Sequence, residues 1–115
     1  MNFIAPVRDQ RMVLDEVVRI AELAALERFA DATADTVDAV LEGAAQFAQG
    51  EFAPLDRIGD TVGSSWTDGV VTTPPGFREA YAAFVAGGWM SLAAPVEAGG
   101  QGLPLALSAA LMEDL

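Results

Sequence analysis

Apolar residues recur every three or four positions in four stretches of this chain, with polar residues between them, which predicts four amphipathic helices. The first helix is expected from about Gln10 to Leu26, within an N-terminal extension over residues 1–30, and the pattern is compatible with a break near its middle. Asp9 is its expected N-cap, because a short side chain with an oxygen can accept a hydrogen bond from the first turn. The apolar stripe of this helix comprises Met12, Val13, Val17, Ile20, Ala21 and Ala24.

The second predicted helix covers residues 33–53 and has the clearest apolar pattern in the chain. Thr33 is in position to cap it, and Asp35 falls in its first turn, where the helix dipole favours a negative charge. We expect Pro54 to end the helix and a loop to follow, because proline cannot continue the backbone hydrogen bonds. The apolar stripe comprises Val37, Val40, Leu41, Ala44, Phe47 and Ala48.

A hairpin signal follows the second helix. The dipeptide Asp68-Gly69 favours a two-residue turn, and Trp66 and Val70 lie on either side of it. We therefore expect a small β-ribbon over residues 64–73.

The third helix is expected over residues 74–88. Thr73 can act as its N-cap with Pro74 at the first helical position, where a missing N–H costs nothing. Gly87 and Gly88 should end it, because glycine adopts the left-handed conformation of a C-cap. The apolar face comprises Phe77, Tyr81, Phe84 and Val85.

Glycines and prolines crowd the stretch GGWMSLAAPVEAGGQGLP, residues 87–104, which we interpret as a loop that reverses the chain. A fourth helix is predicted over 103–115, and we expect it to continue beyond Leu115 because LMEDL carries no stop signal; the chain would then be a fragment. Its stripe comprises Leu103, Leu107, Leu111 and Leu115. The four helices predict one all-α domain, an up-down helical bundle with a small inserted β-hairpin.

The charge balance is strongly acidic, with 6 Lys and Arg against 17 Asp and Glu and a formal net charge of -11. Such a surface repels nucleic acid phosphates and anionic lipids. The absence of Cys and His excludes thiol nucleophiles, disulfides and imidazole bases or ligands. We expect a cytoplasmic protein, because the N-terminus lacks the pattern of a signal peptide and glycines and a proline interrupt the uncharged stretch 80–96.

The glycine-rich GGQGLP is a candidate phosphate cradle, because it precedes a helix whose first N–H groups are free. It follows no predicted strand, lacks a Lys-Ser/Thr pair and does not match the GxGxxG spacing. We interpret it as a tight turn that lets helices pack closely.

Carboxylates provide the remaining candidates for chemistry. Glu97 is the single carboxylate in a long uncharged region and the least ordinary candidate acid or base; the simpler interpretations are that it caps a loop or pairs with Arg78. The aspartates that could bind a metal lack the spacing of a calcium loop and are interpreted as solvated surface. They are Asp31, Asp35 and Asp38 in one group and Asp56 and Asp60 in another.

Aromatic and hydroxyl side chains add no active centre. The aromatic residues are interpreted as packing of the core and hairpin rather than as a cofactor platform, and the serines have no histidine to activate them. We assign no catalytic, cofactor-binding or metal-binding residue, and substrate-binding residues stay unknown. The side chains considered are Trp66, Tyr81 and Trp89, and Ser64, Ser65, Ser91 and Ser108.

Five motifs in a fixed order resemble the N-terminal helical domain of acyl-CoA dehydrogenases over nearly the whole chain. They are APVRDQRMVLDEV, EFAPLDRIGD, TDGVVTTPPGFREAY, GGWMSLAAPVEAGGQGLP and LMEDL. The APVRD extension and the DGVVTTPPGF hairpin are similar to a subgroup of longer dehydrogenases in this family. Ala98 departs from the family pattern, which often has an aromatic residue before the paired glycines.

The resemblance implies a complete subunit with this helical domain, a middle β domain and a C-terminal helical bundle, working as a homo-oligomer with FAD and an electron acceptor. The reaction it implies is the conversion of an acyl-CoA to a 2-enoyl-CoA. It places the catalytic glutamate and most of the acyl pocket in later sequence. The chain should therefore wall the acyl cavity and support the flavin domain, yet bind no FAD and catalyse nothing alone.

A different class of function stays open on the sequence. The chain could be a stand-alone, non-catalytic helical interaction module, with Leu103, Leu107 and Leu111 exposed as a partner surface.

Overall fold

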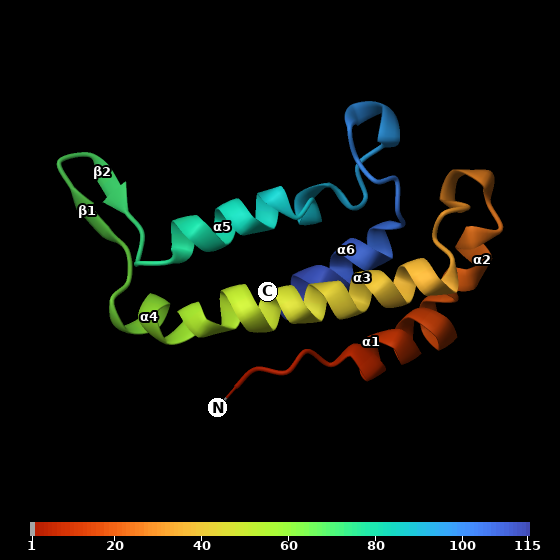
Figure 1. Ribbon diagram of the computed structural model, residues 1–115, viewed down its shortest axis with the longest axis horizontal. Coiled ribbons are helices and arrows are strands. Elements are labelled where there is room, and N and C mark those ends of the chain that lie inside the picture. Colours follow the sequence, from red (N-terminus) through yellow and green to blue (C-terminus); the bar gives the residue numbers. More distant parts are fainter. Residues whose placement is uncertain (1) are drawn as a thin grey trace.

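A computed structural model describes residues 2–115. It is 65% helix and 5% strand, so the predicted class of a helical domain with a small hairpin is confirmed. The molecule is long and flat, 53 × 36 × 19 Å, with a hairpin at one end and packed helices at the other (Figure 1). Its radius of gyration of 16.4 Å exceeds the value of about 13 Å typical of a compact domain of about 100 residues.

Helix α3, Ala34–Phe47, runs through the middle of the molecule. The Thr33 hydroxyl accepts a hydrogen bond from the Thr36 N–H at 3.3 Å, which confirms the predicted N-cap. The predicted apolar stripe faces the core, since its members are buried or half-buried. Helix α3 therefore forms as its pattern predicts.

The prediction of a loop after Pro54 is wrong. The chain stays helical through a π-helical turn at Ala48–Phe52, a 3₁₀ turn at Ala53–Leu55 and helix α4, Asp56–Thr61. Pro54 lies at the start of the 3₁₀ turn, where its missing N–H breaks no hydrogen bond.

The N-terminal segment is helical but differs from its predicted pattern. Helix α1, Val7–Met12, starts after Pro6, so Asp9 lies in the first turn and is not the N-cap. A π-helix follows at Val13–Val18, then α2 at Ile20–Ala24 and a 3₁₀ turn at Glu27–Phe29. The break allowed by the pattern occurs at Arg19, which is left-handed with φ 58°.

The predicted apolar stripe of this segment is correct at Ile20 and wrong at Met12, Val13 and Val17, which are exposed. The face that carries Gln10 and Leu14 is buried instead, because the Gln10 amide is held by hydrogen bonds to α6.

Strands β1, Ser65–Thr67, and β2, Val70–Thr72, form the predicted hairpin, and Trp66 is paired with Val71. Asp68 and Gly69 both have positive φ, as the two-residue turn requires.

Helix α5, Phe77–Ala86, begins three residues later than predicted. Gly76 stands at its N-cap with φ 88°, so Thr73 is not the cap and Pro74 is not the first helical residue. Pro74 instead accepts a turn hydrogen bond from the Phe77 N–H at 3.3 Å. The helix ends at Ala86, and Gly88 with φ 75° provides the left-handed conformation expected of its glycines.

The loop from Gly87 to Pro104 contains two 3₁₀ turns, Trp89–Ser91 and Val96–Ala98, and folds back on itself. Two backbone bonds close it: the Gly102 N–H donates to the Ala94 carbonyl and the Leu103 N–H to the Leu92 carbonyl, both at 2.9 Å. A Cβ on Gly100 would lie 2.0 Å from the Ala94 oxygen. The glycine there permits a close backbone approach.

Helix α6, Leu105–Asp114, lies against α3 and completes the core. The predicted stripe is present but is not a free surface, because Leu103, Leu107 and Leu111 are all buried. The hypothesis that these leucines form an exposed partner surface is therefore wrong. Helix α1 lies along α3 and also contacts α6, since its Gln10 side chain donates to the Ala110 carbonyl (Figure 1).

Candidate binding groove

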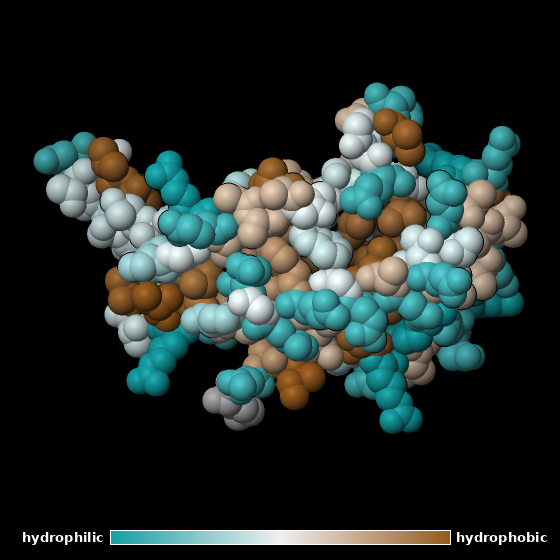
Figure 2. Space-filling view, viewed as in Figure 1, coloured by the Kyte–Doolittle hydropathy of each residue, from teal (hydrophilic) through white to brown (hydrophobic). Residues whose placement is uncertain are grey.

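An apolar groove runs between α5 and the helical segment that follows α3, and it reaches the end of α6. It consists of two adjoining hollows of about 530 and 510 Å³. Figure 2 shows apolar side chains along α5 and between α5 and α3 on this face. Both hollows share three lining residues, Phe52, Tyr81 and Leu115.

Aromatic side chains from four elements form the inner wall of the groove, and Phe47 lies behind the residues that line it. The ring centroids of Phe47 and Phe52 are 5.3 Å apart, and that of Phe47 lies 6.1 Å from Phe84 and 6.0 Å from Trp89. Phe47 and Phe52 are five positions apart, which brings them to the same side because a π-helical turn separates them. The π-turn that the sequence did not predict thus builds this wall.

Close packing fixes Trp89 at one end of this cluster. A Cβ on Gly43 of α3 would lie 3.0 Å from the Trp89 ring. The interpretation of Trp89 as a packing residue is confirmed. Tyr81 is 57% exposed, so its interpretation as a core residue is wrong. Trp66 lies on the hairpin as expected, paired with Val71, but it is 70% exposed.

The groove offers apolar contact and little polar chemistry. Asp56 is the one charged residue in its lining, and Ser108 and the Tyr81 hydroxyl are the other polar groups. An arrangement of this kind can hold an apolar chain or an apolar protein surface, and it presents no general acid paired with a base.

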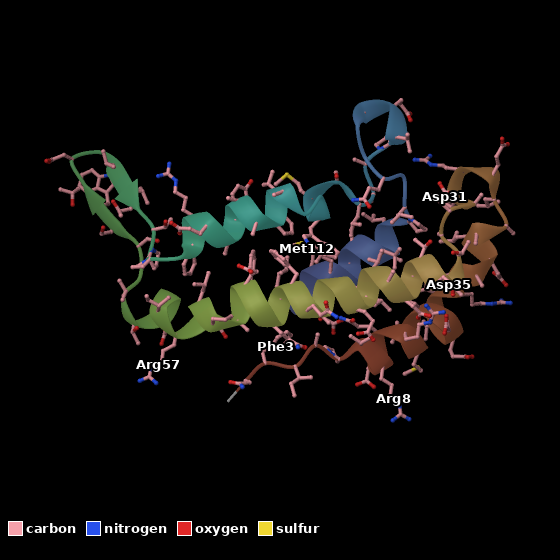
Figure 3. The ribbon with its side chains drawn as sticks, in the orientation of Figure 1. Phe3, Arg8, Asp31, Asp35, Arg57 and Met112 are labelled. Carbon is pink, nitrogen blue, oxygen red and sulfur yellow. The ribbon has the colours of Figure 1, made fainter. Side chains whose placement is uncertain are left out.

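The carboxylates considered from the sequence lie apart from the groove, except for Asp56. Glu97 is exposed in the loop and makes neither a cap bond nor an ion pair with Arg78 within residues 2–115, so both simple interpretations are wrong. Asp31 and Asp35 lie near the start of α3 in Figure 3, and Asp38 pairs with Arg11 at 2.9 Å. In the described part of the chain no three Asp or Glu residues are grouped as metal ligands would be.

The serines have structural positions. Ser91 Oγ donates to the Gly88 carbonyl at 3.1 Å within the loop, and Ser64 and Ser65 lie at the exposed base of the hairpin.

In the part of the chain that is described, no helix has the length and apolarity needed to cross a membrane.

Sequence reasoning missed one buried polar cluster. Gln10 and Asp114 are 5% and 6% exposed, and Gln10 Nε2 donates to Asp114 Oδ1 at 2.7 Å. Burial raises the pKa of the Asp114 carboxyl, the Gln10 hydrogen bond lowers it, and the neighbouring Glu113 raises it. A signal was present in the sequence, because Asp114 continues the face of Leu107 and Leu111 at helical spacing.

Comparison with known proteins supports the resemblance found in the motifs. No protein-family model matches the chain. The chain is 38% identical over 113 residues to 3-methylmercaptopropionyl-CoA dehydrogenase of Ruegeria pomeroyi. The match covers 98% of this chain and 19% of that protein. The resemblance to acyl-CoA dehydrogenases is therefore confirmed, and the chain spans about a fifth of the length of this relative.

Proposed function

We propose that the chain is the N-terminal helical domain of a flavin-dependent acyl-CoA dehydrogenase, in which it walls part of the acyl cavity and supports the flavin domain. The proposal is carried by a 38% identity that extends over 98% of the chain. In the complete protein the reaction would be the α,β-dehydrogenation of an acyl-CoA thioester to a 2-enoyl-CoA. The relative is named as a dehydrogenase of 3-methylmercaptopropionyl-CoA, and we propose a thioester substrate of that general class here.

The flavin itself does not fit the residues of this chain. A dinucleotide needs N–H groups or cations for its pyrophosphate, and the charge of -11 opposes such an anion. The first turn of α6 follows Pro104, and its loop is closed by its own backbone bonds. We therefore propose that FAD is held elsewhere in the complete protein and that the chain alone binds none.

The groove is the surface through which we propose that the domain contributes. Apolar surface stabilises a bound acyl tail, and a lining with few polar groups avoids the cost of removing water from them. The groove around Phe52 and Tyr81 has such a lining. The same wall would contact apolar residues of the adjoining domain. We further propose a cytoplasmic homo-oligomer that passes its electrons to a separate acceptor.

The first test is the intact mass of the protein expressed from its native gene, followed by an acyl-CoA dehydrogenase assay with a dye as electron acceptor. A mass several times that of this chain together with thioester-dependent dye reduction supports the proposal. A protein no longer than this chain, or a longer one without that activity, contradicts it. Titration calorimetry of the chain alone with FAD should give no heat of binding, and micromolar affinity would contradict the assignment of FAD to other segments.

A variant of the complete enzyme tests the role of the groove. Tyr81→Ala enlarges the groove and should raise KM for acyl-CoA more than it changes kcat, because it removes contact with the bound tail. Val17→Ala is the control, since Val17 is exposed and lines neither hollow. Equal values of KM and kcat for the two variants would mean that the groove is not part of the acyl cavity.

A further inference from the structure

The polar pair Gln10 and Asp114 joins the first and last helices of the chain. Besides the bond to Asp114, Gln10 Nε2 lies 3.3 Å from the Ala110 carbonyl and 3.3 Å from Glu113 Oε2. One amide from α1 thus meets three acceptors in the last turns of α6. Because both side chains are buried, water competes little for these bonds.

Two atoms of this pair have no hydrogen-bond partner within residues 2–115, namely Gln10 Oε1 and Asp114 Oδ2. Both are acceptors while the carboxyl is ionised, so they cannot bond to each other. A buried acceptor without a donor costs free energy, and a buried charge costs more. A proton on Asp114 Oδ2 turns one of the two acceptors into a donor and removes the charge.

The charges around Asp114 favour the protonated form. Asp9 of α1 and Glu113 of α6 line the same hollow beside Gln10. The cation of α1 nearest to α3, Arg11, is held by Asp15 at 3.0 Å and by Asp38 of α3 at 2.9 Å. Arg8 points away from α3 in Figure 3. Within residues 2–115 no cation pairs with the buried carboxyl, and negative groups lie near it.

We propose that Gln10 and Asp114 form a proton-dependent latch between α1 and α6. With a proton on Oδ2, the carboxylic acid and the amide bind each other through two hydrogen bonds, Nε2–H to Oδ1 and Oδ2–H to Oε1. Loss of the proton removes the second bond and leaves a buried negative charge, so α1 is held less firmly on α6.

The direction of the pH dependence follows from burial. The pKa of Asp114 is raised in the folded chain above its ordinary value of 3.8, so the folded state binds the proton more tightly than the unfolded state. The stabilisation from the latch is complete below the ordinary value and is lost as pH rises through the raised pKa. This dependence is opposite to that of an aspartate held by a salt bridge.

Asp114→Asn tests the latch, because an asparagine amide offers the acceptor and the donor of a protonated carboxyl at every pH. Urea unfolding of the 115-residue chain should show a midpoint that falls in the wild type as the pH rises through the raised pKa of Asp114, and a smaller fall in the variant. Above that pKa the variant should be the more stable. Glu97→Gln is the control, since it removes the same charge from an exposed loop and should keep the wild-type slope.

The proposal is overturned if Asp114→Asn has the slope of the wild type or if Glu97→Gln abolishes that slope equally. A second measurement needs no variant: carbon NMR of the carboxyl groups should show Asp114 titrating above the exposed aspartates, and titration together with them overturns the latch. Hydrogen-exchange protection of α1 should fall with rising pH relative to that of α3. Equal behaviour of the two helices would place the titrating group elsewhere.

Discussion

Where α1, α3 and α6 meet, apolar side chains are enclosed, whereas at the hairpin end they lie on the surface (Figure 2). Leu107 at the first end is fully buried, and Trp66 at the second is 70% exposed. Helices α3 and α5 both carry an apolar face, yet the face of α3 is largely enclosed and that of α5 is largely exposed, so hydrophobicity alone does not decide burial. At the closed end three helices cover each other, whereas Phe84 of α5 packs against Phe47 and Phe52 and the hairpin strands are exposed throughout.

The exposed aromatic residues mark the hairpin end and the groove beside it, since Trp66 and Tyr81 are 70% and 57% exposed. Exposed contiguous apolar surface marks contact sites in proteins. The hairpin end adjoins the groove, and it is the end at which the domain would meet the remainder of the proposed enzyme. The closed end supplies the free energy of folding.

The largest effect is expected from a pair of leucines on α6. Leu107→Ala should lower the free energy of unfolding by about 2–5 kcal/mol, because it leaves a cavity between α3 and α6. Leu105→Ala is the matched control on the same helix, and since Leu105 is 75% exposed it should change stability by about 0.5 kcal/mol or less. Urea unfolding measures both. Similar losses for the two variants would mean that α6 does not pack as described.

The loop between the two regions gives the next effect. Gly100→Ala should cost about 1–3 kcal/mol, because its new methyl group would collide with the Ala94 backbone. Gly50→Ala, with no atom within 4 Å of the added Cβ, should cause no loss. Thermal unfolding compares the variants at one pH. A tolerated Gly100→Ala would show that the loop need not close on Ala94.

We expect the chain to self-associate at high concentration through the apolar side chains exposed at its hairpin end. Salt should strengthen the association, because it screens the repulsion between copies that each carry a net charge of -11. Sedimentation velocity should show Trp66→Glu less associated than Val17→Glu, which adds the same charge to an exposed residue at the closed end. A monodisperse wild-type monomer at high concentration and high salt would contradict this.

Local signals in the sequence predicted structure where one element decides the outcome. Helix α3 was predicted with its cap and buried stripe, since its periodicity is regular and Thr33 stands at its start. The Asp68-Gly69 turn was predicted for the same reason, because two positive φ values suffice to set the hairpin.

The failures share a cause, since they depend on packing between distant segments. The π-turn at Ala48–Phe52 leaves no short-range signal that separates it from an ordinary helix. The spacing of Asp114 from Leu107 and Leu111 indicates its buried face, but nothing local indicates that Gln10 is its partner. The groove was not predicted either, because Tyr81 on the apolar face of α5 was interpreted as a packing residue. Amphipathicity shows which face is apolar and does not show what covers it.

The smallest effect separates two threonines that the sequence treats alike. Thr33 and Thr73 both precede a predicted helix, yet the structure has a hydroxyl cap at Thr33, and Gly76 occupies the N-cap of α5. Thr33→Ala should therefore cost about 1 kcal/mol, and Thr73→Ala a few tenths at most. Chemical unfolding resolves this difference if both variants are compared with the wild type in one experiment. Equal losses would mean that Thr73 also stabilises its helix and that α5 starts earlier. The start of α5 at the hairpin end would then be capped in the same way as the start of α3.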